Sequence, residues 1–138
     1  MERSSIILFS VALALFILSL SVYSFMNSPL QTTNFFTSVE ITEDKAGFDV
    51  NSTALTFGKV LAGGSGLRRI FLENSYNFTV TVRATKNGAI ASFIDIPQGI
   101  RVKANESIYI PVILNANNIE VLRNYSGTIS FELLRAWR

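Results

Sequence analysis

The sequence predicts an all-β domain, a sandwich of two sheets, preceded by a single apolar helix. Residues 6–26 carry no charge and are mostly apolar, and a helix of this length spans the roughly 30 Å hydrocarbon core of a bilayer. Later in the chain, short segments of alternating apolar and polar residues are separated by turn residues about every ten positions. This spacing is typical of a two-sheet sandwich and not of a parallel sheet.

These patterns divide the chain into four parts. Residues 1–5 form a short cytoplasmic head, and residues 6–26 form a transmembrane helix or a signal sequence. Residues 27–46 begin with polar residues that break a helix, and we predict a linker with a candidate extended strand there. Residues 47–138 form the predicted sandwich.

The apolar run fits two interpretations. As a signal sequence, it would use residues 6–18 as its apolar stretch and residues 22–24 as a small-residue cleavage site. Its length favours a retained anchor, as do Tyr23 and Phe25 at its outer end, where aromatic rings sit in the membrane interface. The predicted partner of residues 6–26 is therefore membrane lipid.

The basic residues near this run favour a cytoplasmic amino terminus. Arg3 precedes the run, and the next basic residue after it is Lys45. We therefore expect a single-pass protein of the cell membrane whose C-terminal domain is extracytoplasmic. Asn-x-Ser/Thr sequons on that side are candidates for glycosylation, although Asn is also common in the turns of β domains. They are Asn51, Asn77, Asn105 and Asn124.

Six segments of the outer domain alternate as strands do. They are residues 68–72, 78–83, 91–96, 100–102, 108–114 and 128–133. Pro111 would remove a ladder hydrogen bond, so its strand is expected to be an edge there or to be bulged. Glycines such as Gly58 and Gly127 are expected at strand ends, where they suit turn geometry. Residues 118–123 are the one candidate for a helical turn.

Several short motifs resemble those of immunoglobulin-like sandwiches of the hydin and major-sperm-protein type. Residues 55–60 fit a Leu-x-Phe-Gly-x-Val strand, and residues 69–75 fit the strand that follows a Gly turn and ends near Asn. Residues 100–112 are similar to the later hairpin, and residues 125–131 to a final Tyr-x-Gly-x-Ile strand. The resemblance covers about residues 48–134. It implies an immunoglobulin-like fold and a structural or protein-binding role without a catalytic site.

The whole layout resembles that of archaeal membrane-anchored pilin-like proteins and archaellum stator proteins. The shared features are an N-terminal apolar helix, a cysteine-free sandwich and sequons. Arg3 is followed by Ser4 and Ser5, whereas pilin processing uses Lys or Arg followed by Gly. An anchored accessory subunit is therefore favoured over a processed filament subunit.

The composition argues against several kinds of chemistry. The chain has no Cys and no His, so disulfides, thiol nucleophiles and the commonest general base and metal ligand are missing. The net charge of +2 comes from scattered residues without a basic stripe, which argues against nucleic-acid binding. Four carboxylates within residues 40–49 lack a calcium-loop pattern. We expect no enzyme activity, no cofactor, no metal and no small-molecule substrate.

The predicted function is that of a membrane-anchored, extracytoplasmic structural or adhesion module. Its sandwich would bind another envelope protein, or a second copy, by burying apolar surface or by offering a sheet edge. Candidate contacts are Phe35, Phe36 and Val39, which follow the linker, and Trp137 near the carboxyl end; ordinary core packing is the alternative for all four. Two other functions stay open: a stator-like subunit of a surface appendage, and a secreted ligand-binding domain after signal cleavage.

Overall fold

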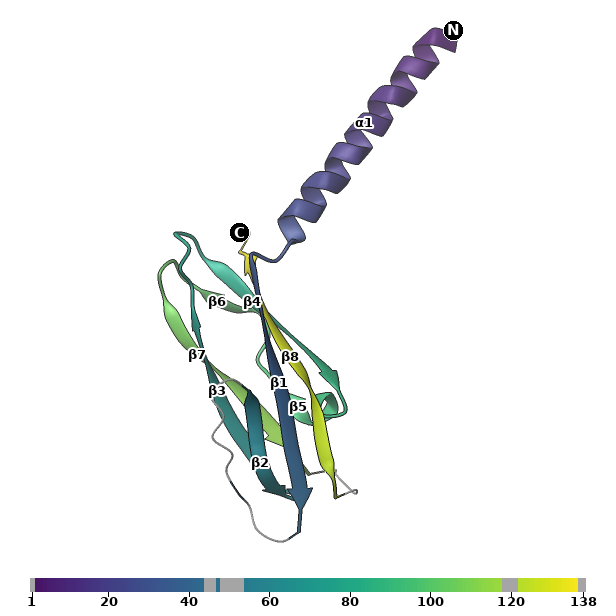
Figure 1. The fold of residues 1–138 in the computed structure, drawn as a ribbon. Coiled ribbons are helices and arrows are strands. Elements are labelled where there is room, and N and C mark those ends of the chain that lie inside the picture. The colour runs from purple at the N-terminus through teal and green to yellow at the C-terminus, as the bar shows by residue number, and fades with distance from the viewer. Residues whose placement is uncertain (1, 44–46, 48–53, 118–121, 137–138) are drawn as a thin grey trace.

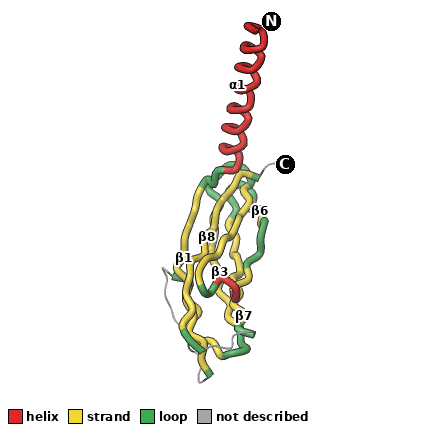
Figure 2. Tube along the Cα trace, turned by 90° about the vertical axis from the view of Figure 1, so that its right-hand side faces the viewer, coloured by secondary structure: helices red, strands yellow, loops and turns green. Residues whose placement is uncertain are grey.

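The fold consists of one long helix and a two-layered body of strands. A computed structural model describes residues 2–43, 47, 54–117 and 122–136. The helix, α1 (Glu2–Asn27), projects from one end of the elongated body, and the last strand ends beside its base (Figures 1 and 2). This architecture confirms the predicted all-β, two-sheet sandwich with one preceding N-terminal helix.

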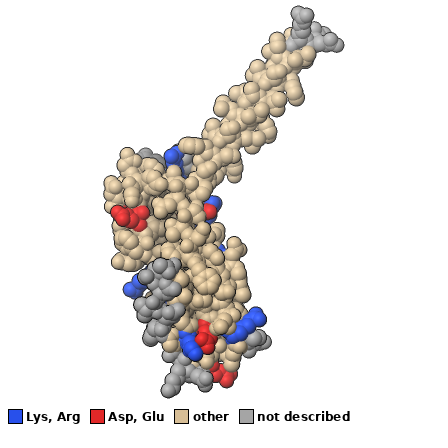
Figure 3. Space-filling view, in the orientation of Figure 1, with Lys and Arg blue, Asp and Glu red and all other residues tan. Residues whose placement is uncertain are grey.

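Helix α1 packs against nothing along most of its length. Its candidate membrane span, Ser4–Asn27, has a mean hydropathy of 2.6, and none of it is buried. Figure 3 shows it as an uncharged rod, with the charged residues in view gathered on the sandwich. At its C-terminal end, side chains donate hydrogen bonds to backbone carbonyls of the last turn. Asn27 Nδ2 donates to Tyr23 O at 2.9 Å, and Ser28 Oγ donates to Ser24 O at 2.8 Å. The helix is long and apolar enough to cross a membrane, a property that N-terminal signal sequences share.

The larger sheet contains five strands in the order β2-β1-β8-β4-β6. Their bounds are β1 Gln31–Thr42, β2 Leu55–Leu61, β4 Val80–Gly88, β6 Ile100–Val102 and β8 Asn124–Arg135. Strand β1 runs parallel to β2 and antiparallel to β8. It therefore lies inside this sheet, although its residues belong to the segment predicted as a linker with a candidate strand.

The smaller sheet contains three strands in the order β3-β7-β5. Their bounds are β3 Ser65–Glu73, β5 Ile94–Asp95 and β7 Ser107–Asn115. A 3-10 turn, η1 (Ala91–Phe93), occupies the first half of the segment predicted as a strand at 91–96. Pro111 pairs with Arg69 of β3, whereas β5 reaches only Ile113 and Leu114 on the other side of β7. Strand β7 is thus an edge at Pro111, as expected.

The core lies between the two sheets and is apolar. Its most deeply buried side chains come from both layers and include Val80, Val102, Ile110, Val112 and Leu114, all with no exposed area. Asn74, in the loop between β3 and β4, is also fully buried. Its Nδ2 donates to the carbonyl oxygens of Phe78, Val102 and Lys103 at 2.9, 3.1 and 2.8 Å, and its Oδ1 accepts from Tyr76 N at 3.1 Å. This one side chain fixes the loops nearest to α1.

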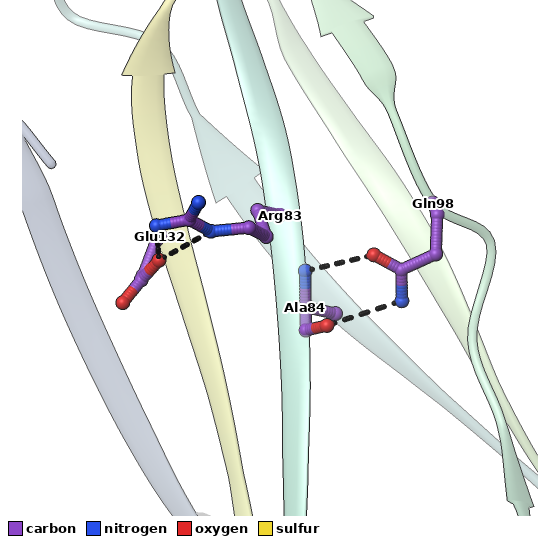
Figure 4. A network of polar contacts seen from close by, with 4 residues as sticks. All are labelled: Arg83, Ala84, Gln98 and Glu132. Carbon is purple, nitrogen blue, oxygen red and sulfur yellow. Dashed lines mark hydrogen bonds and ion pairs between the residues drawn. The ribbon is translucent and has the colours of Figure 1, made fainter. Parts of the chain in front are cut away.

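Two polar contacts hold strand β4 on either side (Figure 4). The Gln98 side-chain amide forms two hydrogen bonds with the backbone of Ala84, as a residue of a neighbouring strand would. Ala84 N donates to Gln98 Oε1 at 3.2 Å, and Gln98 Nε2 donates to Ala84 O at 3.1 Å. Arg83 pairs with Glu132 of β8 through Nη2, 2.6 Å from the carboxylate. Gln98 therefore continues the pairing of β4 just past the short β6, which itself pairs with β4 only from Val80 to Val82.

Candidate interaction surface

Half of strand β1 has a neighbour on one side only. Residues 31–40 pair with β8 throughout, but the pairing with β2 covers only residues 37–42. Within the described residues, no strand lies beside residues 31–36 on the side away from β8. We call this stretch the open edge. Exposed edges of this kind present unpaired backbone groups to other chains.

The register shows which backbone groups face outward at the open edge. Ile41 N donates to Arg123 O of the β8 side at 3.1 Å, and Ala62 N donates to Thr42 O from the β2 side at 3.1 Å. In an antiparallel ladder this direction alternates residue by residue, so odd-numbered residues of β1 face β8 and even-numbered residues face away. The N–H and C=O groups of Thr32 and Asn34 therefore point to the open side.

A groove of about 300 Å³ runs beside the open edge, between β1 and β3. Its lining is mixed: the buried residues Ile70, Phe131 and Leu133 form an apolar floor, and polar atoms, as at the exposed Gln31 and Thr33, make up much of its accessible lining. We call it the edge groove. The full set of lining residues is Gln31, Thr33, Phe35, Ile70, Phe71, Leu72, Glu73, Ser75, Phe131 and Leu133.

The structure separates the four residues predicted as partner contacts. Phe35 is half-buried in the edge groove, with its ring edge-on to Phe131 at a centroid distance of 6.1 Å. Phe36 points to the opposite face and is 56% exposed. Val39 is 2% exposed because it points between the sheets, so it belongs to the core. Trp137 lies outside the described residues.

A second hollow, of about 580 Å³, lies near Phe36 on the outer face of the larger sheet. Ser38, Glu40, Lys59 and Asn124 are among its lining residues. Glu40 Oε1 is 3.2 Å from Lys59 Nζ, and about half of each side chain is exposed. An ion pair this exposed to solvent contributes little to stability.

An apolar patch that the sequence interpretation missed covers the outer face of the smaller sheet. Leu67, Phe71 and Tyr109 are 49%, 55% and 68% exposed. The Phe71 and Tyr109 rings lie 5.4 Å apart across β3 and β7. The signal was present in the sequence, because residues 107–115 carry apolar or aromatic side chains on both faces of one strand.

The described sequons lie at both ends of the sandwich. Asn77 and Asn105 are exposed in loops at the end that faces α1, and Asn124 is exposed at the start of β8, at the other end. Asn51 lies outside the described residues. In the part of the chain that the structure describes, no three acidic side chains gather into a group that could hold a metal ion.

Comparisons with known proteins give a likeness of fold. No protein-family profile and no curated protein matches the sequence. Among solved structures, the chain is similar to the DraE adhesin in complex with chloramphenicol succinate, with a TM-score of 0.42 and 11% identity over 79% of this chain and 98% of that chain. It is also similar to the AfaE-3 adhesin from Escherichia coli, with a TM-score of 0.40 and 12% identity over 80% and 98%. The hydin, major-sperm-protein and archaeal resemblances stay predictions.

Proposed function

We propose that this protein is a membrane-anchored, extracytoplasmic structural or adhesion module that binds another envelope protein at the open edge of β1. The observation that carries the proposal is the unpaired backbone of Thr32 and Asn34 beside the edge groove. An extended segment of a partner could add itself to the larger sheet there. Its backbone would supply the hydrogen bonds, and its side chains would supply the specificity.

The edge groove sets the chemistry of the partner segment. A strand next to β1 directs every second side chain towards the core, at intervals of roughly 7 Å. Those side chains would enter the apolar floor formed by Ile70, Phe131 and Leu133. The partner is therefore an extended segment with apolar residues at alternate positions. Between them, polar residues suit the exposed outer face, where Thr32 and Asn34 are exposed.

Helix α1 provides the anchor in this proposal. An apolar, unburied helix of 24 residues next to the amino terminus supports insertion in a bilayer, with the head in the cytoplasm and the sandwich outside. The open edge belongs to the half of the sandwich that joins α1, because β1 begins at Gln31, four residues after the helix ends. A partner at this edge would lie close to the membrane.

Photocrosslinking in cells that express the full chain tests the proposal. A photoreactive phenylalanine analogue would replace Phe35 in the edge groove, and in a second strain it would replace Tyr109 on the smaller sheet. We expect one dominant envelope protein to be captured from position 35 and none from position 109. Asn34→Pro should abolish this crosslink, because proline removes the outward N–H of an edge strand. Capture from position 109 alone would contradict the proposed edge.

A further inference from the structure

An arginine occupies the point where the helix meets the sandwich. Arg135 ends β8, and its Cζ lies 5.0 Å from the centroid of the Phe25 ring in α1 and 5.7 Å from that of Phe78. Its Nε is buried without a hydrogen-bond partner in the described part of the chain. No carboxylate among the described residues pairs with it. The guanidinium therefore lies over two rings, and its Nε has no acceptor among the described residues.

The tether between helix and sandwich is very short. Helix α1 ends at Asn27, and Leu30 N already donates to Leu133 O of β8 at 2.7 Å. Three residues of extended chain span at most about 11 Å. If α1 crosses a bilayer, this end of the sandwich must stand at the level of the lipid headgroups. Tyr23 and Phe25 in the last turns of α1 mark that level, since aromatic rings favour the interface.

The loop between β3 and β4, beside Arg135, carries two aromatic rings that are held in place by packing and hydrogen bonds. Tyr76 and Phe78 stack with ring centroids 5.3 Å apart, and the Tyr76 hydroxyl donates to Leu30 O at 3.5 Å. The loop that carries both rings is held by the buried Asn74. Amphipathic and aromatic side chains of this kind settle at a lipid–water boundary, where one part is apolar and the other is wet.

We infer that this end of the sandwich is a lipid-binding surface and that the Arg135 guanidinium binds the phosphate of a membrane lipid. A guanidinium matches phosphate geometry with two parallel hydrogen bonds, and it is weakly hydrated enough to stack on aromatic rings at the same time. Arg135 is only partly buried, so a lipid phosphate would meet the accessible part of its side chain, while its covered Nε leaves the charge without a partner among the described residues. The inference rests on the proposed anchoring by α1. It adds that the sandwich has a fixed orientation relative to the bilayer.

Single-cysteine labelling tests the inference, because the chain has no Cys of its own. Asn77→Cys places a nitroxide in the loop next to Arg135. Asn87→Cys places one near the far end of β4, roughly 23 Å from Val80 at a rise of about 3.3 Å per residue. The full chain is reconstituted in phosphatidylcholine nanodiscs, and the accessibility of each label to oxygen and to a water-soluble nickel chelate is measured. We expect the label at 77 to be shielded from nickel and the label at 87 to be open to it.

Variants of two stacked arginines provide the decisive comparison. Arg135→Gln should expose the label at 77 to nickel. Arg123→Gln should leave it shielded, because Arg123 stacks on Tyr125 at 4.9 Å, at the other end of β8. Circular dichroism checks that each variant is folded, and Arg135→Lys, which keeps the charge, should retain part of the shielding. A folded Arg135→Gln chain whose label at 77 stays as shielded as in the parent would overturn the inference.

Phosphate-free micelles separate lipid from other sources of phosphate. In dodecyl maltoside the label at 77 should be open to nickel, and dissolved inorganic phosphate should not shield it. Shielding by dissolved phosphate to the same degree as by lipid would assign the site to a soluble anion and overturn the lipid assignment. Failure of the full chain to enter nanodiscs at all would instead overturn the anchoring by α1, so the two failures are distinguishable.

Discussion

At the scale of single residues, Asn74 holds together the end of the sandwich that joins α1. Its side chain is fully buried and takes part in four hydrogen bonds, three of them as a donor to backbone carbonyls. These hydrogen bonds satisfy backbone groups that have no strand partner in the loops. Because backbone groups that lose a buried partner keep their full desolvation penalty, one residue can control the position of two loops.

Asn74→Ala is therefore expected to lower the free energy of unfolding by about 3 kcal/mol, since three buried or part-buried carbonyls lose their donor together. Chemical denaturation of the full chain in detergent micelles, followed by circular dichroism in the β region, measures the loss. Asn77→Ala, three residues along the same loop but exposed, is the matched control and should change stability by less than about 0.5 kcal/mol. Equal effects of the two substitutions would contradict the role assigned to Asn74.

At Gly127, a glycine is required by close packing and not by a turn. It lies inside β8, and a Cβ there would fall 2.1 Å from Asn87 O and 2.9 Å from Ile90 Cγ2. We expect Gly127→Ala to destabilise the domain by about 3 kcal/mol, the upper range for overpacking, because a backbone atom cannot move aside. Thermal unfolding checks this. Gly47→Ala, whose Cβ would meet nothing closer than 3.8 Å, should be nearly neutral.

At the scale of elements, the alternating pattern predicted the residue ranges of the strands better than it predicted which strands pair and in which register. Strand β7 follows its predicted range closely, and all its inward residues are apolar. Gly58 was expected at a strand end, yet it has φ 67° inside β2, where the register against β1 shifts by one residue. Such a bulge is set by the partner strand, and the sequence of β2 alone does not contain it.

The same limit explains what the sequence left open at the site. Phe35, Phe36 and Val39 lie in one apolar segment, and only the pairing of β1 with both β2 and β8 sorts them into groove, surface and core. The edge groove itself is formed by residues from β1, β3 and β8, which are far apart in the chain. No local sequence pattern predicts where a strand lacks a paired strand on one side.

Two proline substitutions in β1 test its assigned edge. Asn34→Pro removes an N–H that faces the open side, so we expect the free energy of unfolding to change by less than about 1 kcal/mol. Thr33→Pro removes an N–H that faces β8 and leaves a buried carbonyl without its donor, which should cost about 2–3 kcal/mol. Denaturation of both variants under the same conditions gives the comparison. A larger loss for Asn34→Pro would mean that the alternation has the opposite phase.

At the scale of the whole molecule, the short connection between α1 and β1 would tie the domain to the membrane in the proposed arrangement. An unpaired strand edge that floats free in solution is a risk of aggregation. If α1 anchors the chain as proposed, the same edge lies a few residues from the bilayer and meets only those chains that approach along its surface. The open edge and the contact between Arg135 and Phe25 both lie in the half of the sandwich that joins α1, the end from which the helix projects in Figure 1.

Retention of α1 is accordingly the prediction on which the proposed functions depend. We expect the protein extracted from its native membrane to have the intact mass of the full chain, 15.3 kDa, apart from modifications, and to resist release by alkaline carbonate. A cleaved signal would instead leave a soluble protein that begins shortly after residue 24, and N-terminal sequencing would show it. In that case Phe25 would lie at a free terminus, and both the rigid Arg135 stack and the membrane-held edge would lose their physical basis.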